Sequence, residues 1–415
     1  MPESPASTSA APGKSLPEKG LVPRLMSVDA LRGFDMFWII CAEELVAALH
    51  KMSPNWLVNF VSTQLDHVEW EGVHFEDLIF PLFVFIMGVS SVFSLTKIIA
   101  REGRAAAIGR VVRRSVLMFV LGLIFYGGLS NHWPHMRLMG VLNRIALCYF
   151  FGGLAFCLLK PRALVGLAAG LLLGYWALMA WVPFPDVRPT PGGDSVITKE
   201  NHPDKSTLNL ASTTMIHGTY IQGVNLANYV DQKYLPGKPW DGTYDPEGIL
   251  STIPAVVTCL LGIFAGLFLM SENFCHTRKA AYLIGGGGAL VLLGLLWGLE
   301  FPIIKKIWTS SYVLVAGGYS AIMLGVFYWV VDVMHFQWWC QPFVWMGMNS
   351  ITIYVVSHLL DGFLGLSSRL VGGDVMDFFN ARVQGLGDLL VAIVAMVLVF
   401  WFLNYLYRKK VFLRL

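Results

Sequence analysis

Charged side chains are scarce in this sequence. Asp, Glu, Lys and Arg make up 14% of its 415 residues, whereas 55% of the residues are hydrophobic. A soluble domain usually has about 25% charged residues, because charge covers much of its water-facing surface. So little charge excludes an ordinary soluble domain of this length. The composition instead predicts an all-α polytopic membrane protein.

Two further features are missing. The formal net charge is only +3, and no basic run is interleaved with aromatic residues, so a nucleic-acid partner is not expected. The cysteines form neither a C-x-x-C pair nor a disulfide framework, and most lie singly in apolar segments, where they are expected to be small core residues. They are Cys41, Cys148, Cys157, Cys259, Cys275 and Cys340.

The first 23 residues are rich in Pro, Ser and Ala, which predicts a disordered cytoplasmic tail. They are not expected to be a signal peptide. The apolar segment that follows contains Asp29, Arg32 and Asp35, and no small-residue cleavage site ends it. Residues 24–415 are therefore expected to form one transmembrane domain.

A membrane-spanning helix needs about 20 apolar residues, and ten segments approach that length. They lie near 29–49, 76–97, 111–129, 138–158, 163–182, 248–270, 280–299, 309–331, 341–361 and 386–407.

The distribution of Lys and Arg predicts the orientation of these spans. Six basic residues lie between Lys97 and Arg114, and further basic residues precede the fifth and seventh spans and follow the last. Because cytoplasmic connections are enriched in Lys and Arg, both termini are expected in the cytoplasm. The stretch LDHVEWEG (65–72) and a polar loop at 183–247 then face the opposite side. Lys305 and Lys306 are the exception to this pattern.

Ionised groups inside a span are usually paired or line a wet cavity. At 100° per residue, Asp29, Arg32 and Glu43 fall on one helical face. Two interpretations remain open: a structural Asp29–Arg32 pair with a solvated Glu43, or the wall of a polar channel leading from the cytoplasm toward His67.

Two more polar groups lie within expected spans. Asn143 and Arg144 fall in the fourth, where an arginine requires an anion, either a carboxylate or a phosphate. Asn349, Ser350 and His358 fall in the ninth, as a functional set or as hydrogen bonds between helices.

Two histidines stand beside carboxylates at the start of the second span. His67 neighbours Asp66 and Glu69, and His74 precedes Glu76 and Asp77, which suit the capping of a helix N-terminus. This spacing fits no standard metal pattern such as H-E-x-x-H, so no metal is expected.

Five stretches, in order from about Arg24 to the last expected span, resemble the heparan-α-glucosaminide N-acetyltransferase family. They are RLMSVDALRGFD, DHVEWEGVHFEDLIFPLFVFIMG, GVLNRIALCYF, YDPEGILSTIPAVVTCLLGIFAG and GMNSITIYVVSH.

The resemblance implies an acetyltransferase that takes acetyl-CoA from the cytoplasm and acetylates the amine of a glucosamine unit across the membrane. The family's catalytic histidine stands three residues before a tryptophan and five before a glycine, which maps it onto His67, with Trp70 and Gly72 in register. One position departs from the family: Glu43 stands where the lysosomal enzyme has a functional asparagine. The lysosomal member's additional N-terminal lumenal domain and first span are not expected in this protein. We therefore expect a bacterial inner-membrane protein whose acceptor site faces the periplasm.

Acetylating an amine requires a base, because an ammonium is not a nucleophile, and imidazole titrates in the suitable range. Whether His67 acts as a base or as a nucleophile that carries the acetyl group is left open.

The residues expected to take part in catalysis are His67, Glu43 and Asp66. Those expected to contact the acceptor are Glu43, Glu69, Trp70 and Asp245. Those expected along the acetyl-CoA route are Arg32, Arg113, Asn143, Arg144, Asn349 and Ser350.

Two other functions remain as alternatives. Ionisable groups within spans are also typical of a proton-coupled transporter, although Gly- or Pro-broken helices at matching places in two halves are not clear here. An O-acyltransferase of a surface polysaccharide would share the acyl donor. The expected partners are acetyl-CoA, an amino-sugar acceptor and the lipid bilayer, and whether the protein is a homo-oligomer is left open.

Overall fold

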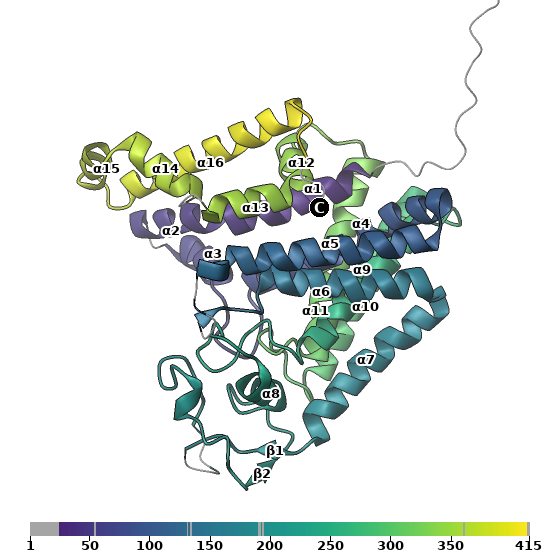
Figure 1. The fold of residues 1–415 in the computed structure, drawn as a ribbon. Coiled ribbons are helices and arrows are strands. Elements are labelled where there is room, and N and C mark those ends of the chain that lie inside the picture. Colours follow the sequence, from purple (N-terminus) through teal and green to yellow (C-terminus); the bar gives the residue numbers. More distant parts are fainter. Residues whose placement is uncertain are drawn as a thin grey trace, which may run out of the picture.

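Helices form almost all of the regular structure in the computed structural model (Figure 1). It describes residues 25–412 except 54, 131, 133, 134, 190, 191, 193, 194, 360 and 361. The tail predicted at 1–23 and the side chain of His358 lie outside the described part.

The helices of the first half of the chain are α1 (Met26–Phe37), α2 (Glu43–Met52), α3 (Trp56–Leu65), α4 (Phe75–Glu102), α5 (Arg104–Phe125), α6 (Val141–Leu158) and α7 (Pro161–Trp181). Those of the second half are α8 (Leu226–Tyr234), α9 (Thr252–Met270), α10 (His276–Trp297), α11 (Ser310–Phe327), α12 (Gln341–Met348), α13 (Ser350–Leu359), α14 (Gly362–Val371), α15 (Gly373–Asn380) and α16 (Leu386–Arg408).

Seven described helices are long and apolar enough to cross a membrane, or eight if the bent pair of α13 and α14 is one span. The seven are α4, α6, α7, α9, α10, α16 and the continuous helix Ser310–Val333. The predicted all-α polytopic class is confirmed at this level. The ten-span count stays a prediction, because the predicted spans near 29–49, 111–129 and 341–361 are not among these seven helices. The cytoplasmic termini also stay a prediction.

The helix predicted at 29–49 contains a π-helical segment. Five residues, Trp38–Ala42, separate α1 from α2 without ending the helix. A π turn holds more residues than an α turn, so the rotation of 100° per residue does not continue across it. Asp29 and Arg32 lie on α1, whereas Glu43 follows the π segment. The single face predicted for all three is therefore wrong in its geometry.

The helix predicted at 341–361 is interrupted. α12 ends at Met348, Asn349 leaves the helical conformation, and α13 begins at Ser350. The polar pair Asn349–Ser350 thus marks a break between two short helices.

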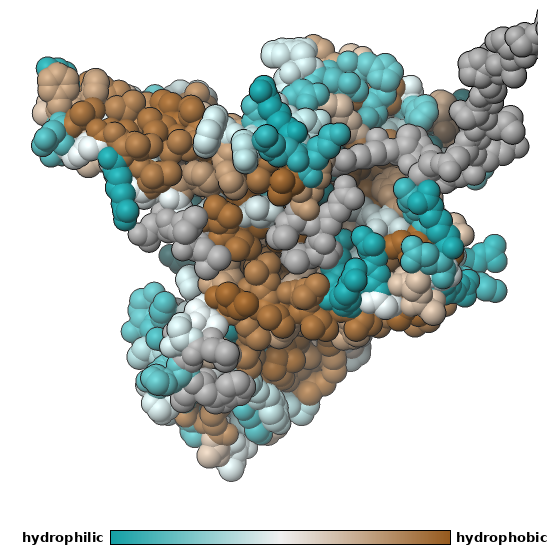
Figure 2. All heavy atoms as spheres, turned by 45° about the horizontal axis from the view of Figure 1, so that its top comes forward, coloured by the Kyte–Doolittle hydropathy of each residue, from teal (hydrophilic) through white to brown (hydrophobic). Residues whose placement is uncertain are grey.

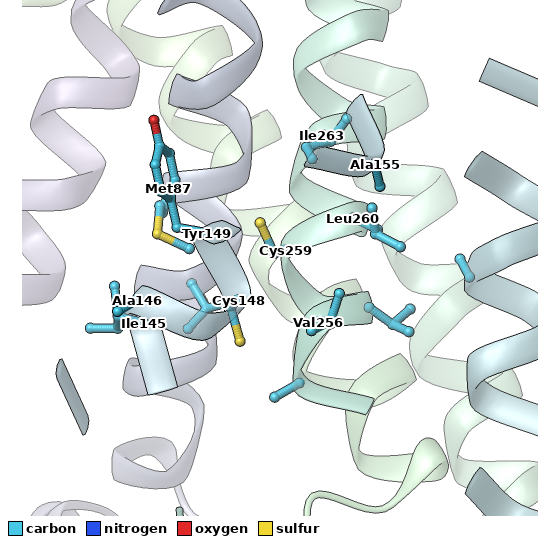
Figure 3. Close-up of a cluster of buried hydrophobic side chains, with 14 of the residues drawn as sticks. Met87, Ile145, Ala146, Cys148, Tyr149, Ala155, Val256, Cys259, Leu260 and Ile263 are labelled. Carbon is cyan, nitrogen blue, oxygen red and sulfur yellow. The ribbon is translucent and has the colours of Figure 1, made fainter. Parts of the chain in front are cut away.

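Glycine allows α4 and α9 to pack closely. A Cβ atom added to Gly262 would lie 2.0 Å from the backbone oxygen of Phe85, and one added to Gly88 would lie 2.2 Å from that of Cys259. Small residues of this kind let membrane helices approach each other. The buried cluster around this contact contains Met87, Cys148 and Cys259 (Figure 3).

All six cysteines are free thiols. Five of them are buried, as predicted for small core residues, and Cys275 is exposed.

The 183–247 segment folds onto one end of the helices, at the bottom of Figure 1. It contains α8 and the short antiparallel strands β1 (Phe184–Pro185) and β2 (Met215–Ile216). Tyr175 at the end of α7 packs in one buried cluster with Phe184 and Tyr229 of this segment. In Figure 2 the middle of the visible face and the arm at its upper left are largely hydrophobic, and hydrophilic residues gather at the top, the right and the lower left.

Candidate active site

His67, Asp77 and Lys305 form a compact polar cluster. The Nδ1 atom of His67 lies 2.9 Å from Oδ1 of Asp77. Lys305 Nζ lies 3.1 Å from that same nitrogen and 3.1 Å from the same carboxylate oxygen. The histidine side chain is 59% exposed, whereas that of Asp77 is 1% exposed. The ring therefore faces open space while its carboxylate partner is held inside the protein.

The start of α4 fixes the carboxylate of Asp77. His74 caps the helix, and its backbone N–H donates to Asp77 Oδ2 at 3.0 Å. The backbone N–H of Val68 donates to the same oxygen at 3.2 Å. Oδ2 of Asp77 thus accepts from the start of the helix and from the 67–74 loop, which holds this loop over the first turn of α4. The other carboxylate oxygen, Oδ1, stays available for His67. The Tyr312 hydroxyl donates to the Asp77 carbonyl at 2.5 Å and ties this turn to α11.

The short Nδ1–Oδ1 distance suits the tautomer of the neutral imidazole that carries its proton on Nδ1. A ring nitrogen that carries hydrogen can donate to the Asp77 carboxylate, and the other nitrogen then holds a lone pair. With the proton on Nδ1, Nε2 of His67 becomes the basic atom. The carboxylate would also stabilise the imidazolium that forms when Nε2 accepts a proton.

Two adjoining cavities meet at His67. The loop-side cavity, of about 570 Å³, lies against the 183–247 segment and includes Glu69, Arg137 and Trp240. The helix-side cavity, of about 190 Å³, lies between helices and is lined mainly by apolar side chains, with Glu76 and Ser350 among the polar ones. Both cavities are lined by His67, Val141, Glu247, Lys305 and Tyr354. Two molecules could therefore approach His67 from different sides.

Arg137 shapes the loop-side cavity. Its guanidinium donates two hydrogen bonds to Asp245, at 2.8 and 2.7 Å, and one to Glu247 at 2.7 Å. It also lies over the rings of Tyr126 and Trp240. Burial acts to lower the pKa of Arg137, but the hydrogen bonds and charges of the two carboxylates outweigh it and raise the pKa. Burial raises the pKa of Glu247.

Some residues predicted from the sequence lie in these cavities. His67 lines both, Glu69 lines the loop-side cavity, and Ser350 lines the helix-side cavity. Asp245 does not line either cavity but holds Arg137 in place from behind. The exposed carboxylate of Glu69 forms no ion pair with any described residue.

Three other predicted residues are not brought against the His67 ring. Glu43 is exposed and lines a third cavity of about 290 Å³ near α14 and α16, which shares Ile39 and Tyr354 with the helix-side cavity but does not include His67. The exposed Asp66 contributes its backbone oxygen, which accepts from His74 Nδ1 at 2.8 Å. Trp70 donates from Nε1 to the backbone oxygen of Tyr220 at 2.7 Å and packs against the buried cluster of the 183–247 segment. Its role in this structure is to anchor the loop.

Most residues predicted along the acetyl-CoA route have partners within the protein. Arg32 donates to the Gly347 carbonyl and to Ser90 and pairs with Asp29. Arg144 is fully buried and donates to Ser251 and to the Gly248 carbonyl.

The amide nitrogens of both asparagines also donate within the protein, whereas their buried amide oxygens accept no hydrogen bond from the described residues. Asn143 donates to the Phe119 carbonyl, which links α6 to α5, and Asn349 donates to the Trp345 carbonyl. Arg113 is exposed on α5. Only Ser350 of the predicted set lies in a cavity that His67 also lines.

Sequence reasoning missed Asp77 and Lys305 as partners of His67. Asp77 was interpreted only as a capping group, and it has both roles. The sequence did single out Lys305, because it is a basic residue on the side predicted to lie outside the cytoplasm. The loop before α11 is held beside the 67–74 loop by a hydrogen bond of 2.9 Å from the Gly72 N–H to the Ile303 carbonyl, and this brings Lys305 to His67. No group of three or more His, Cys, Asp or Glu side chains suited to hold a metal occurs among the described residues.

The fold and the site define a class: a multi-helix membrane protein with an oriented histidine where two cavities meet. No family model matches the chain. The heparan-alpha-glucosaminide N-acetyltransferase of Mus musculus is 29% identical over 384 residues, which cover 83% of this chain and 56% of the relative. That of Homo sapiens is 27% identical over 435 residues, 94% of this chain and 60% of the relative.

These matches confirm, at the family level, the relationship to the heparan-alpha-glucosaminide N-acetyltransferases that the sequence motifs predicted. The chain spans less than two thirds of the length of these relatives.

Proposed function

We propose that this protein is a transmembrane N-acetyltransferase that passes the acetyl group of acetyl-CoA to the amine of glucosamine or a glucosaminide. The relatives' names supply the reaction class. The observation that carries the proposal is the meeting of two cavities at one oriented histidine. A two-substrate transfer requires such an arrangement, because donor and acceptor must be held together at the reacting atoms.

In the proposed reaction, His67 Nε2 first removes a proton from the acceptor ammonium. The free amine attacks the thioester carbon, a C–N bond forms and the C–S bond breaks. The departing thiolate takes a proton from the imidazolium, and the second proton of the amine nitrogen leaves to water. Asp77 holds the ring in the required tautomer throughout. Direct attack needs no acetylated histidine, so we favour His67 as a base.

The acceptor is proposed to occupy the loop-side cavity. Glu69 is an exposed carboxylate in that cavity without an ion pair in the described chain, so it suits an ammonium group. Trp240 is 57% exposed there and offers an aromatic surface to a sugar. Asp245 acts indirectly, through Arg137. Glu43 and Asp66 have no direct role in this proposal.

The acetyl end of the donor is proposed to enter through the helix-side cavity, where Ser350 can hydrogen-bond to it. The exposed Arg113 lies on the side predicted to be cytoplasmic and suits a CoA phosphate. Arg32, Asn143, Arg144 and Asn349 are proposed to support this route structurally, through their contacts within the protein.

The proposed location is a bacterial inner membrane. The distribution of Lys and Arg supports an orientation in which the donor comes from the cytoplasm and the acceptor cavity faces the periplasm. The direct test is to incubate the purified protein with acetyl-CoA and glucosamine and to measure free CoA and N-acetylglucosamine together. Equal amounts of both products support the proposal. CoA release with an O-acetylated product would favour the O-acyltransferase alternative, and no CoA release would reject acetyl transfer.

A further inference from the structure

Lys305 contacts both members of the His67–Asp77 pair. The nitrogen and the oxygen that lie 2.9 Å apart are each 3.1 Å from Lys305 Nζ, so the three atoms form a nearly equilateral triangle. The lysine also lines both cavities. None of the steps of the proposed reaction involves it.

The hydrogen bonds of this triangle cannot all form at once. An ammonium only donates, and Nδ1 of a neutral imidazole either donates or accepts. Asp77 Oδ1 can accept from both His67 and Lys305, whereas Nδ1 cannot donate to Asp77 while accepting from Lys305. The arrangement with a basic Nε2 is therefore the one in which both His67 and Lys305 donate to Asp77.

Lys305 opposes a positive charge on the ring. A protonated His67 would place two positive charges about 3 Å apart, which is unfavourable even near water. Asp77 alone would have the opposite effect and would hold the ring as an imidazolium. The positive charge of Lys305 offsets this effect of the Asp77 carboxylate on the ring.

Few other described charges can perform this task. The acidic groups that line the cavities beside His67 are Glu69, Glu76, Asp77 and Glu247, and they favour a charged ring. Of the cations, Arg137 is engaged by Asp245 and Glu247, and Lys306 pairs with Asp241 at 2.8 Å. Lys305 is the cation that pairs with Asp77.

The chain around Lys305 is firmly held. The Lys305 carbonyl accepts from the N–H of Trp308 at 2.9 Å. The Trp308 side chain is 1% exposed and packs edge-on against Phe80 of α4. The ammonium is therefore presented to His67 by a rigid turn, and not by a free surface loop.

We propose that Lys305 is a positioning residue that opposes protonation of His67 between turnovers and favours release of the proton that Nε2 takes from the acceptor ammonium. That proton passes from Nε2 to the departing thiolate sulfur. This inference rests on the proposed acetyltransferase function.

The test is the pH dependence of kcat/KM for acetyl transfer in the full-length protein and in Lys305→Met, Lys305→Gln and Lys305→Arg. Methionine keeps the stem of the side chain, glutamine can still donate to Asp77, and arginine keeps the charge. Both neutral variants should lose activity mainly at low pH, because the acid limb of their profile moves up by about one pH unit or more. Lys305→Arg should keep the acid limb of the wild type.

Lys160→Met is the matched control, since Lys160 is exposed at the turn before α7, and its profile should not move. The inference is overturned if the folded neutral variants lose the same factor at every pH, as a structural role predicts, or if their profiles equal that of the wild type. A wild type without His67-dependent transfer at any pH would instead reject the proposed function.

Discussion

At the scale of single residues, the site depends on which carboxylate faces His67. The sequence placed Asp66 next to the histidine, and adjacency in the chain suggested a partner. The structure instead brings Asp77 to Nδ1, because the 67–74 loop turns back over the first turn of α4. A residue ten positions away is closer than a neighbour once the loop has folded. A motif can identify His67, but it does not show the direction of its ring.

Replacing Asp77 with Asn should lower kcat for acetyl transfer by about 10²- to 10⁴-fold, because an amide does not orient the ring or stabilise an imidazolium as a carboxylate does. Binding of acetyl-CoA should change little, since Asp77 contacts His67, the proposed general base, and not the proposed binding site of the donor. Steady-state kinetics and a binding titration measure the two effects. Asp66→Asn should cost much less activity; an equal loss in both variants would restore the sequence-based assignment.

At the scale of elements, the long apolar helices were predictable because hydropathy alone marks them. The break at Asn349 and the π segment Trp38–Ala42 were not, because each depends on packing against other helices. Trp70 shows the same limit. A tryptophan three residues after His67 suggested a contact with the acceptor, yet its N–H donates to the Tyr220 backbone oxygen and so holds the 183–247 segment.

The contact between α4 and α9 can be tested with a matched pair of glycine variants. Gly262→Ala should destabilise the protein by about 1–3 kcal/mol, because its Cβ would lie 2.0 Å from the Phe85 backbone oxygen. Gly285→Ala on α10 should not destabilise it, since nothing lies within 4 Å of that Cβ. Thermal unfolding in detergent measures both. Equal stability of the two variants would contradict the close packing of α4 and α9.

The 183–247 segment should respond to pH through Asp231 on α8. Burial raises the pKa of this carboxyl from 3.8 to about 7, although the N–H of Ile249 donates to it at 2.8 Å. A pKa raised on folding adds stability that is complete below about pH 4 and is lost as the pH rises through 7. Asp231→Asn should remove this loss.

The free energy of unfolding of the wild type should therefore fall relative to that of Asp231→Asn between pH 4 and pH 7. Denaturation at several pH values measures the difference. A constant difference across this range would show that Asp231 titrates alike in the folded and unfolded states.

At the scale of the whole molecule, the sequence was sufficient for the class and the family, since both rest on features spread along the chain. It was not sufficient for the cavities, which form between segments as distant as 67–77, 137–141, 240–247 and 305–308. The pattern of apolar residues within one segment does not show which other segments it will contact.

The predicted topology can be tested by fusion. A reporter active only outside the cytoplasm should work when inserted within 183–247 and fail when fused after Leu415, because connections rich in Lys and Arg are expected on the cytoplasmic side. Reporter activity at the C-terminus would show that the number of spans or their orientation is wrong.

The central claim is that His67 performs the acetyl transfer where the two cavities meet. Its most direct test is acetyl transfer from acetyl-CoA to glucosamine by purified His67→Ala, with His74→Ala as the matched control. The account predicts that His67→Ala loses at least about 100-fold in rate while it still binds acetyl-CoA, and that His74→Ala stays close to the wild type. Full activity of folded His67→Ala would contradict the account.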